Sequence, residues 1–269
     1  MAARVESPAA RQPLPEFTFT RRSTMKPVAI VRHTKSEGPA YFATFLDSRS
    51  LPWQLIAIDA GDCVPADAGA FAGLCLMGGP MSVNDPLPWI DEVGALIRDA
   101  DARGLPVIGH CLGGQLISKA FGGEVTRSPV KEIGWGHARA ETNESAGHWL
   151  GDSLVASGGE ATVFQWHGET FSLPDGAQRI LRNECCANQM FVLGHHLAMQ
   201  CHVEMTPELI VRWCQGWPDE VRGLDPLPDN IQTPALMQAQ MHDKIPVMRR
   251  LADQLYSVWI EGLGGVSTE

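Results

Sequence analysis

The stretch VIGHCLGGQLISKAFGG, residues 107–123, decides the class of fold. An apolar, strand-like run ends at Gly109, Cys111 stands at the tip of a tight turn, and a helix-like segment begins at once. Such a turn pushes the thiol into the cleft above the carboxyl edge of a sheet, and the helix dipole favours the thiolate. Glycines at 109 and 113 let strand and helix pass closely, as in the G-x-S-x-G elbow of hydrolases. We therefore interpret Cys111 as a nucleophile; a buried structural cysteine is the alternative.

Strand-like and helix-like segments alternate before this stretch. Apolar runs occupy residues 28–31, 53–59 and 73–79, and helical patterns occupy residues 38–49 and 88–104. Continuous apolar strands separated by amphipathic helices indicate a parallel sheet that is covered by helices on both faces. The sequence therefore predicts an α/β fold with an open, mostly parallel sheet.

The pattern changes after Gly123. Short strand-like pieces follow and predict an extension of the sheet or an antiparallel flank; they are GGEVTRSP (122–129), EIGWGHARA (132–140), TVFQWHG (162–168), QRILRNE (178–184), NQMFVLG (188–194) and HLAMQCH (196–202). Thr206 and Pro207 are typical of the cap and first turn of a helix. A closing amphipathic helix begins near residue 243 and ends before Gly262.

Composition and charge exclude several classes of protein. The chain has 269 residues, of which 44% are hydrophobic, enough for one large or two small α/β domains. No apolar run approaches about 18 residues, so we expect no membrane-spanning segment. The formal net charge of −10 repels phosphate backbones, so nucleic acid is not an expected partner.

The seven cysteines indicate a reducing compartment. Their number is odd and several lie in apolar runs, which fits free thiols in the cytoplasm better than a disulfide framework. Zinc is an alternative where cysteines and histidines lie close in sequence, at Cys185, Cys186, His195, His196, Cys201 and His202. No C-x-x-C or H-x-x-x-H spacing occurs there, so we expect buried neutral side chains, no metal and no other cofactor.

Two His-x-Glu segments compete for the role of the catalytic base. One is QCHVE, with His202 and Glu204, and the other is WHGE, with His167 and Glu169. Residues i and i+2 of an extended segment point to the same side, so either carboxylate can orient its imidazole. Both segments follow strand-like runs, where catalytic groups of open sheets gather, so these residues alone leave both pairs open.

A candidate oxyanion site lies in LMGGPMS, residues 76–82. Two glycines and a proline end a strand there, and backbone N–H groups at such a point can face a developing oxyanion. The N–H of Leu112 is the expected second donor. An ordinary strand-ending turn is the alternative.

Together these motifs resemble the class I, triad-type glutamine amidotransferases, in particular stand-alone proteins similar to the amidotransferase domain of GMP synthase. MGGPMSVND resembles the family's oxyanion strand, GHCLGGQLISKAFGG its G-x-C-x-G-x-Q elbow, and MQCHVE its Q-x-H-x-E segment. KEIGW and FQWHGETFSLPDGA resemble two further motifs of the stand-alone branch. The five motifs, within about residues 28–214, stand in the family's order and imply its flavodoxin-like sheet.

The resemblance implies roles for individual residues. Cys111 is expected to be the nucleophile, His202 the base and Glu204 the orienting acid. Oxyanion N–H groups are expected at Gly79 and Leu112. The residues expected to contact the substrate are Gln115, one helical turn beyond the cysteine, with Gly78, Trp166 and His167.

The resemblance also divides the chain. Residues 25–216 are expected to form the amidotransferase domain, and residues 217–269 a helical extension that packs on the same domain and could cover the cleft or join a homodimer. Residues 1–24 are expected to be a disordered tail or the result of a mis-called start; a mitochondrial transit peptide is the alternative. Cys201 and Val203 depart from the family, since many members have Phe and Pro beside the histidine.

The implied reaction is cleavage of the γ-amide of glutamine to glutamate and ammonia through a γ-glutamyl thioester. A γ-glutamyl peptidase with the same residues is one alternative, and a catalytically silent regulatory or binding subunit is another. A cysteine-dependent α/β-hydrolase is a fourth interpretation, although its acid usually precedes the histidine. No ATP motif occurs, so released ammonia would pass to a separate synthetase partner or to solvent.

Overall fold

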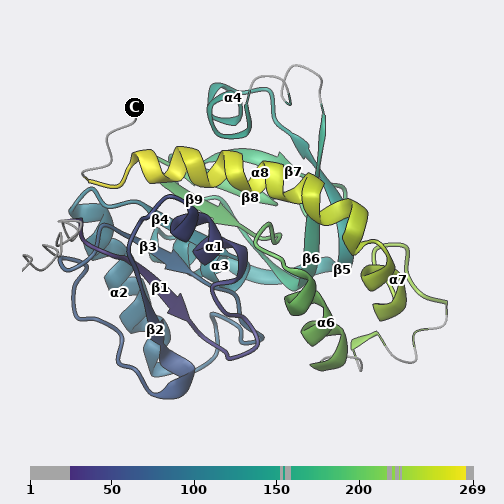
Figure 1. Cartoon of the computed structure of the whole chain (residues 1–269), viewed down its shortest axis with the longest axis horizontal. Coiled ribbons are helices and arrows are strands. Elements are labelled where there is room, and N and C mark those ends of the chain that lie inside the picture. Colours follow the sequence, from purple (N-terminus) through teal and green to yellow (C-terminus); the bar gives the residue numbers. More distant parts are fainter. Residues whose placement is uncertain are drawn as a thin grey trace, which may run out of the picture.

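The computed structural model describes residues 25–264 except 152–153, 155–158, 217–219, 222–223 and 225. The segment 1–24, expected to be a tail or a mis-called start, lies outside the described residues. The described chain forms one open sheet of nine strands with helices packed on it (Figure 1). Among the helices described, none combines the length and the apolar character that crossing a membrane requires.

One half of the sheet is parallel. Its strands are β1 (Val28–Arg32), β2 (Trp53–Ala57), β3 (Gly73–Leu76), β4 (Val107–His110) and β9 (His196–Met199). They lie in the order β2-β1-β3-β4-β9, which is the 2-1-3-4-5 order of flavodoxin-like sheets. The predicted α/β fold is thereby confirmed.

The other half of the sheet is antiparallel. Its strands are β5 (Val125–Ala140), β6 (Glu160–Phe171), β7 (Gln178–Arg182) and β8 (Met190–Leu193), and they continue the sheet from β9 in the order β8-β7-β5-β6. The sheet as a whole is therefore mixed. The two pieces predicted at 122–129 and 132–140 are one strand, whose pairing register shifts between Arg127 and Glu132. Pro129 lies inside that irregularity, where its missing N–H breaks no ladder hydrogen bond.

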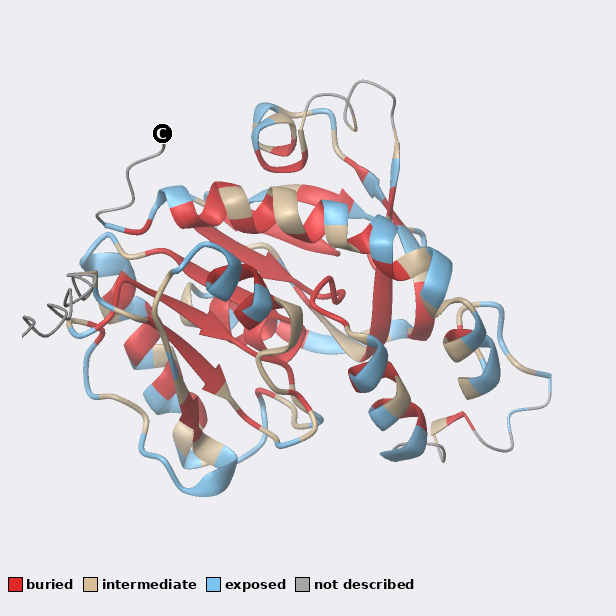
Figure 2. Cartoon of the chain, in the orientation of Figure 1, coloured by how far each residue is buried: buried red, intermediate tan, exposed pale blue. Residues whose placement is uncertain are grey.

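Helices cover both faces of the sheet. They are α1 (Ala40–Ser48), η1 (a 3-10 turn, Ile58–Ala60), α2 (Pro88–Ala102), α3 (Leu112–Ala120), α4 (Glu144–Leu150), α6 (Pro207–Gly216), α7 (Pro234–Ala239) and α8 (Met241–Glu261). Alternate side chains of β1 enter two apolar cores: Val28 and Ile30 pack in the core that holds α1 and α8. Ala29 and Val31 pack in the core that holds α2 and α3. The buried strands between these layers are red in Figure 2.

The helix α8 packs lengthwise on the sheet and against α1 (Figure 1). Its Tyr256 ring lies 4.9 Å from the Phe42 ring and 5.2 Å from the Phe45 ring, measured between centroids. Tyr41 donates a hydrogen bond of 2.7 Å to Asp253. These contacts join two helices that lie far apart in the sequence.

Side-chain caps mark the starts of α4, α6 and α7. Thr206 Oγ1 accepts a hydrogen bond from Leu209 N (3.2 Å), and Gly262 follows the end of α8, as predicted. The sequence analysis missed α4 and α7. Asn143 caps α4 and Thr233 caps α7, so both helices carried the same kind of start signal.

Candidate active site

Cys111 stands on a strained turn between β4 and α3. Its backbone has φ 49° and ψ −106°, a combination that non-glycine residues rarely adopt. The backbone crowds on either side: a Cβ on Gly109 would lie 2.4 Å from Gly113 C, and one on Gly113 would lie 2.1 Å from Leu76 O. Cys111 N also donates to Met199 O at 2.8 Å. Close packing of β3, β4, β9 and α3 therefore holds the strained residue in place.

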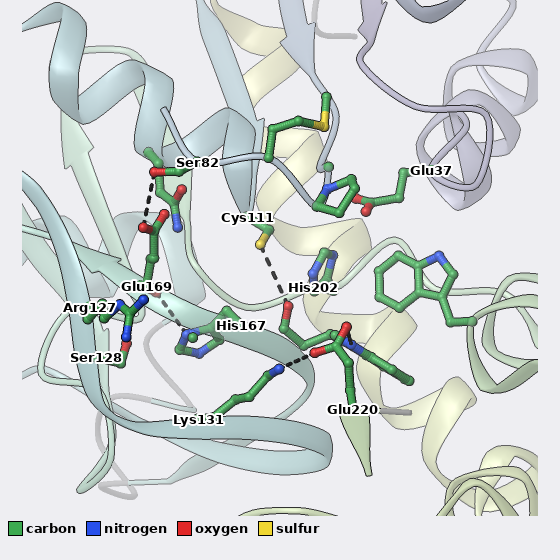
Figure 3. A pocket seen from close by; sticks show the side chains of 17 residues that line it. Glu37, Ser82, Cys111, Arg127, Ser128, Lys131, His167, Glu169, His202 and Glu220 are labelled. Atoms are coloured by element: carbon green, nitrogen blue, oxygen red, sulfur yellow. Dashed lines mark hydrogen bonds and ion pairs between the residues drawn. The ribbon is translucent and has the colours of Figure 1, made fainter. Parts of the chain in front are cut away.

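A pocket of about 530 Å³ opens above Cys111. It lies at the carboxyl edge of the parallel strands, where open α/β sheets bind their ligands. Its walls come from Glu37, Gly79, Pro80, Met81, Ser82, Cys111, Gln115, Arg127, Ser128, Lys131, Trp166, His167, Gly168, Glu169, His202, Trp213 and Glu220 (Figure 3).

His202 and Glu204 form a buried pair beside Cys111. His202 Nδ1 lies 2.6 Å from Glu204 Oε1, and the second carboxylate oxygen accepts a hydrogen bond from Val203 N at 2.9 Å. The backbone of His202 is fixed to β6 by reciprocal hydrogen bonds with Phe164 of 2.8 and 3.0 Å. Cys111 and His202 line the same pocket, and Figure 3 shows them side by side.

This arrangement favours the charged form of both partners. Burial lowers the pKa of His202, but the Glu204 carboxylate and the Cys111 side chain outweigh it, so the net pKa lies well above the usual value. Burial raises the pKa of Glu204, but His202 and then His110 lower it to about 2. An imidazolium held between sulfur and carboxylate is therefore the favoured state.

His110, the residue before Cys111, lies behind Glu204. Its Nε2 lies 2.9 Å from Tyr256 Oη and 3.9 Å from Glu204 Oε2. Burial lowers the pKa of His110, which favours the neutral ring. Tyr256 belongs to α8, so this helix reaches Glu204 through His110 and contributes no residue to the pocket wall.

The second His-x-Glu pair does not form. His167 Nδ1 lies 3.0 Å from the backbone oxygen of Glu169, and the Glu169 carboxylate accepts a hydrogen bond of 3.0 Å from Ser82 Oγ. His167 Nε2 instead lies 3.2 Å from Oε2 of Glu132, its neighbour across the β5–β6 ladder. His167 lines the pocket with its side chain held by β5 and β6.

Glu132 is a hydrogen-bonding centre that the sequence analysis did not find. Its two oxygens accept bonds from Asn183 Nδ2 (2.6 Å) and Gln189 Nε2 (2.9 Å). One potential metal-ligand atom from each of Glu132, His167 and Cys186 also lies within 4.8 Å of the other two, a spacing that a metal ion could use. The carboxylate is already satisfied by protein donors, and burial raises the pKa of the Cys186 thiol. We therefore assign this cluster to hydrogen bonding.

Three of the other sequence-predicted residues line the pocket. Gly79 and Gln115 line the pocket, as does Trp166, whose backbone oxygen lies 4.0 Å from Cys111 Sγ. Among the described residues, neither Gly79 N–H nor Leu112 N–H donates a hydrogen bond. Gly78 and Leu112 do not line the pocket.

Gly78 makes room for Glu37, a residue that the sequence analysis missed. A Cβ on Gly78 would lie 1.8 Å from Glu37 Oε2 and 3.5 Å from the His202 ring. Glu37 is 5% exposed and lines the pocket. Burial and the neighbouring Glu204 charge outweigh the attraction of His202 and raise the pKa of Glu37 to about 8. It is therefore a largely neutral acid near pH 7.

Gln200 is a second missed residue. Its side chain accepts a hydrogen bond from Gln115 Nε2 (3.2 Å) and its own Nε2 lies 3.6 Å from Cys111 Sγ. Because it stands two residues before His202, the Q-x-H-x-E spacing was the available signal for it.

Comparison with known proteins identifies the family of this chain. The family model for glutamine amidotransferase class-I matches residues 48–210. The glutamine amidotransferase-like protein YfeJ of Salmonella typhimurium is 32% identical over 190 residues, 68% of this chain and 77% of its own length. Gamma-glutamyl peptidase 3 of Arabidopsis thaliana is 25% identical over 63% of this chain and 71% of its own. The glutamine-hydrolyzing GMP synthase of Aromatoleum aromaticum is 31% identical over 50% of this chain, which spans 26% of that protein.

The solved structures agree with the sequence relatives. The crystal structure of a glutamine amido transferase from Methylobacillus flagellatus aligns with a TM-score of 0.85 and 42% identity, over 91% of this chain and 98% of that one. The fold and the family match place this protein among the class I glutamine amidotransferases. The chain belongs to that family, as the motifs around Cys111 indicated.

Proposed function

We propose that this chain is a γ-glutamyl amidohydrolase that cleaves the side-chain amide of glutamine through Cys111. One observation carries the proposal: His202 is buried between Glu204, at 2.6 Å, and the Cys111 side chain, at the floor of an open pocket. A nucleophile, a base and an orienting acid are thus in the order that covalent acyl transfer needs.

The expected reaction has two stages. Cys111 gives its proton to His202 and its Sγ bonds to the amide carbon. The carbonyl oxygen becomes an oxyanion, which takes hydrogen bonds from Gly79 N–H and Leu112 N–H. The C–N bond then breaks, and the nitrogen leaves as ammonia with a proton from His202. Water next gives a proton to His202 and attacks the γ-glutamyl thioester. Glutamate departs and the thiol recovers its proton.

The amino-acid end of the substrate is expected on the Ser82 side of Cys111. Arg127 and Glu169 face each other across the β5–β6 ladder and both line the pocket there (Figure 3). Their charges complement the α-carboxylate and the α-ammonium group of a γ-glutamyl compound. Gln115 lies on the same wall and contributes side-chain hydrogen bonds.

A γ-glutamyl peptidase is the second candidate. The pocket of about 530 Å³ lies in the range of sites for drug-sized ligands, so it accommodates more than one amino acid. The family resemblance to an Arabidopsis γ-glutamyl peptidase supports the same candidate. Delivery of ammonia to a separate synthetase remains a proposal, which the likeness to GMP synthase supports.

The test is whether the isolated chain acts without ATP. We expect glutamate and ammonia release from glutamine, loss of both in Cys111→Ala, and labelling of Cys111 by 6-diazo-5-oxo-norleucine. Cys201→Ala is the matched control, because Cys201 is buried outside the pocket wall. Alkylation of Cys111 without turnover of any γ-glutamyl compound would contradict the proposal and favour a partner-dependent or silent subunit.

A further inference from the structure

The pocket continues past Cys111 on the His202 side. Four residues line this continuation, which we name the leaving-group wall: Lys131, Trp166, Trp213 and Glu220. In Figure 3, Ser82, Glu169 and Arg127 lie on one side of Cys111, whereas Lys131 and Glu220 meet on the side of His202. Ammonia, as the leaving group from glutamine, needs none of these contacts. We therefore expect a larger leaving group to contact this wall.

Chemistry decides which end of a substrate lies there. His202 must hand its proton to the scissile nitrogen, so the departing group leaves on the His202 side of the sulfur. The γ-glutamyl part then occupies the opposite side. The leaving-group wall is therefore in contact with whatever replaces the amide hydrogen of glutamine.

Lys131 supplies a positioned positive charge on this wall. Its ammonium forms an ion pair with Glu220, and Glu220 Oε1 in turn accepts a hydrogen bond of 3.3 Å from Trp166 Nε1. Its stem lies on Gly168, with three carbons within 3.7–3.9 Å of the position a Cβ would take. An ammonium group has three donors, so pairing with one carboxylate leaves donors for a second.

Aromatic rings form the rest of the wall. The Trp213 ring lies 4.9 Å from the His202 ring and 5.7 Å from the Trp166 ring, in both cases nearly perpendicular. These faces suit the carbon atoms of a ligand that passes between the imidazole and the lysine. Charge at one end and apolar surface between match an amino acid bound through its carboxylate.

We propose that the leaving-group wall binds the α-carboxylate of an amino acid or short peptide in γ-glutamyl linkage, with Lys131 as the residue that recognises it. This inference rests on the proposed function and names its substrate class. In such a substrate the carboxyl carbon is two bonds from the scissile nitrogen. When Cys111 forms the thioester, the C–N bond breaks, the nitrogen takes the His202 proton, and a free amino acid or peptide departs.

Three substrates that differ only in the leaving group test the inference. They are glutamine, γ-glutamyl methylamide and γ-glutamylglycine, which add in turn a methyl group and a carboxylate. We expect kcat/KM for γ-glutamylglycine to exceed that for the methylamide by about tenfold or more, through KM, as a charge-assisted hydrogen bond contributes.

Variants at Lys131 isolate the charge. Lys131→Gln should lower the glycine-to-methylamide ratio about tenfold, and Lys131→Arg should restore most of it. Arg139→Gln is the matched control, because it removes a positive charge from the same strand outside the pocket and should leave the ratio unchanged. Thermal unfolding of each variant shows that it is folded.

The outcomes separate this inference from the proposed function. Equal efficiency on the methylamide and on γ-glutamylglycine, or an unchanged ratio in Lys131→Gln, would overturn the inference while Cys111-dependent hydrolysis still supports the proposed function. No Cys111-dependent hydrolysis of any of the three compounds would overturn both. A high ratio that falls in Lys131→Gln and returns in Lys131→Arg supports both.

Discussion

Two segments of this chain carry the same Q-x-H-x-E pattern and end in different structures. Residues 200–204 follow the end of β9, and residues 165–169 lie inside β6. Only in the first do the histidine and glutamate side chains meet, at 2.6 Å. In the second the histidine bonds to the glutamate's backbone oxygen, and the carboxylate goes to Ser82.

The backbone explains the difference. After β9 the chain leaves the sheet, and Glu204 turns back so that its second oxygen meets Val203 N. Glu169 remains in the β5–β6 ladder opposite Arg127, and His167 faces Glu132 across the same ladder. Whether the histidine and glutamate side chains meet thus depends on where the strand ends as well as on i, i+2 spacing.

Removing each histidine in turn should give the largest difference in activity between the two segments. His202→Ala should lower kcat about 10⁴-fold, because it removes the base of one stage and the acid of the other. His167→Gln should cost about tenfold or less, since that ring only shapes the pocket wall. Glutamate release by the two folded variants measures both effects. The opposite ranking would place the base in β6.

Removing each glutamate should give a smaller contrast. Glu204→Gln should lower kcat about 10³-fold, because an amide cannot stabilise the imidazolium in the same way. Glu169→Gln should mainly raise KM, about tenfold, if it binds the substrate ammonium. Steady-state kinetics of both variants separates kcat from KM. A kcat loss in Glu169→Gln as large as in Glu204→Gln would contradict the difference between the segments.

The hydrogen bonds of Glu132, which lies opposite the second segment, should contribute to the free energy of unfolding. Glu132→Gln places an amide donor against the side-chain donors of Asn183 and Gln189, so unfolding free energy should fall by about 2 kcal/mol. Glu160→Gln, an exposed member of the same sheet, should change it by less than about 0.5 kcal/mol. Urea unfolding measures both; equal stability of the two variants would argue against a buried hydrogen-bonding centre.

We expect the smallest effect from Glu37, which lies near His202 of the first segment. Below its raised pKa of about 8 the carboxyl is neutral, and above it a negative charge appears beside Gly78 and His202. That charge opposes an oxyanion, so kcat/KM should fall severalfold as pH rises through about 8. Glu37→Gln should lose this fall, whereas Glu92→Gln on the exposed face of α2 should keep it. An unchanged profile in Glu37→Gln would exclude Glu37 as the titrating group.

Local signals predicted the parallel half of the fold well. Apolar runs, glycine turns and the helix caps at Thr206 and Gly262 act over a few residues, and the structure has them where the sequence indicated. The sequence predicts two pieces where β5 is one strand, because Pro129 and its neighbours are typical of a turn. The strand β6, which pairs with both pieces, is distant in sequence. Long-range pairing overrides such local signals.

Long-range contacts also limited the prediction of the site. The elbow and the His-x-Glu segments are contiguous motifs, so Cys111, His202 and Glu204 could be named from the sequence. Glu37 reaches the pocket from a segment without a motif. Lys131 begins the KEIGW segment, but the resemblance assigned no role to that lysine. The sequence holds no local sign that a carboxyl on one loop will rest on Gly78 of another.

The packing of α8 on α1 has a consequence for biosynthesis. Tyr41 and Asp253, which bond to each other, are 212 residues apart, so roughly 10 to 40 s of translation separate them at typical rates. During that interval the Phe42 and Phe45 rings lack the tyrosine ring that later packs on them. We expect ribosome-bound chains that end before residue 241 to be cleaved readily by protease and captured by chaperones, and chains that include α8 to resist both.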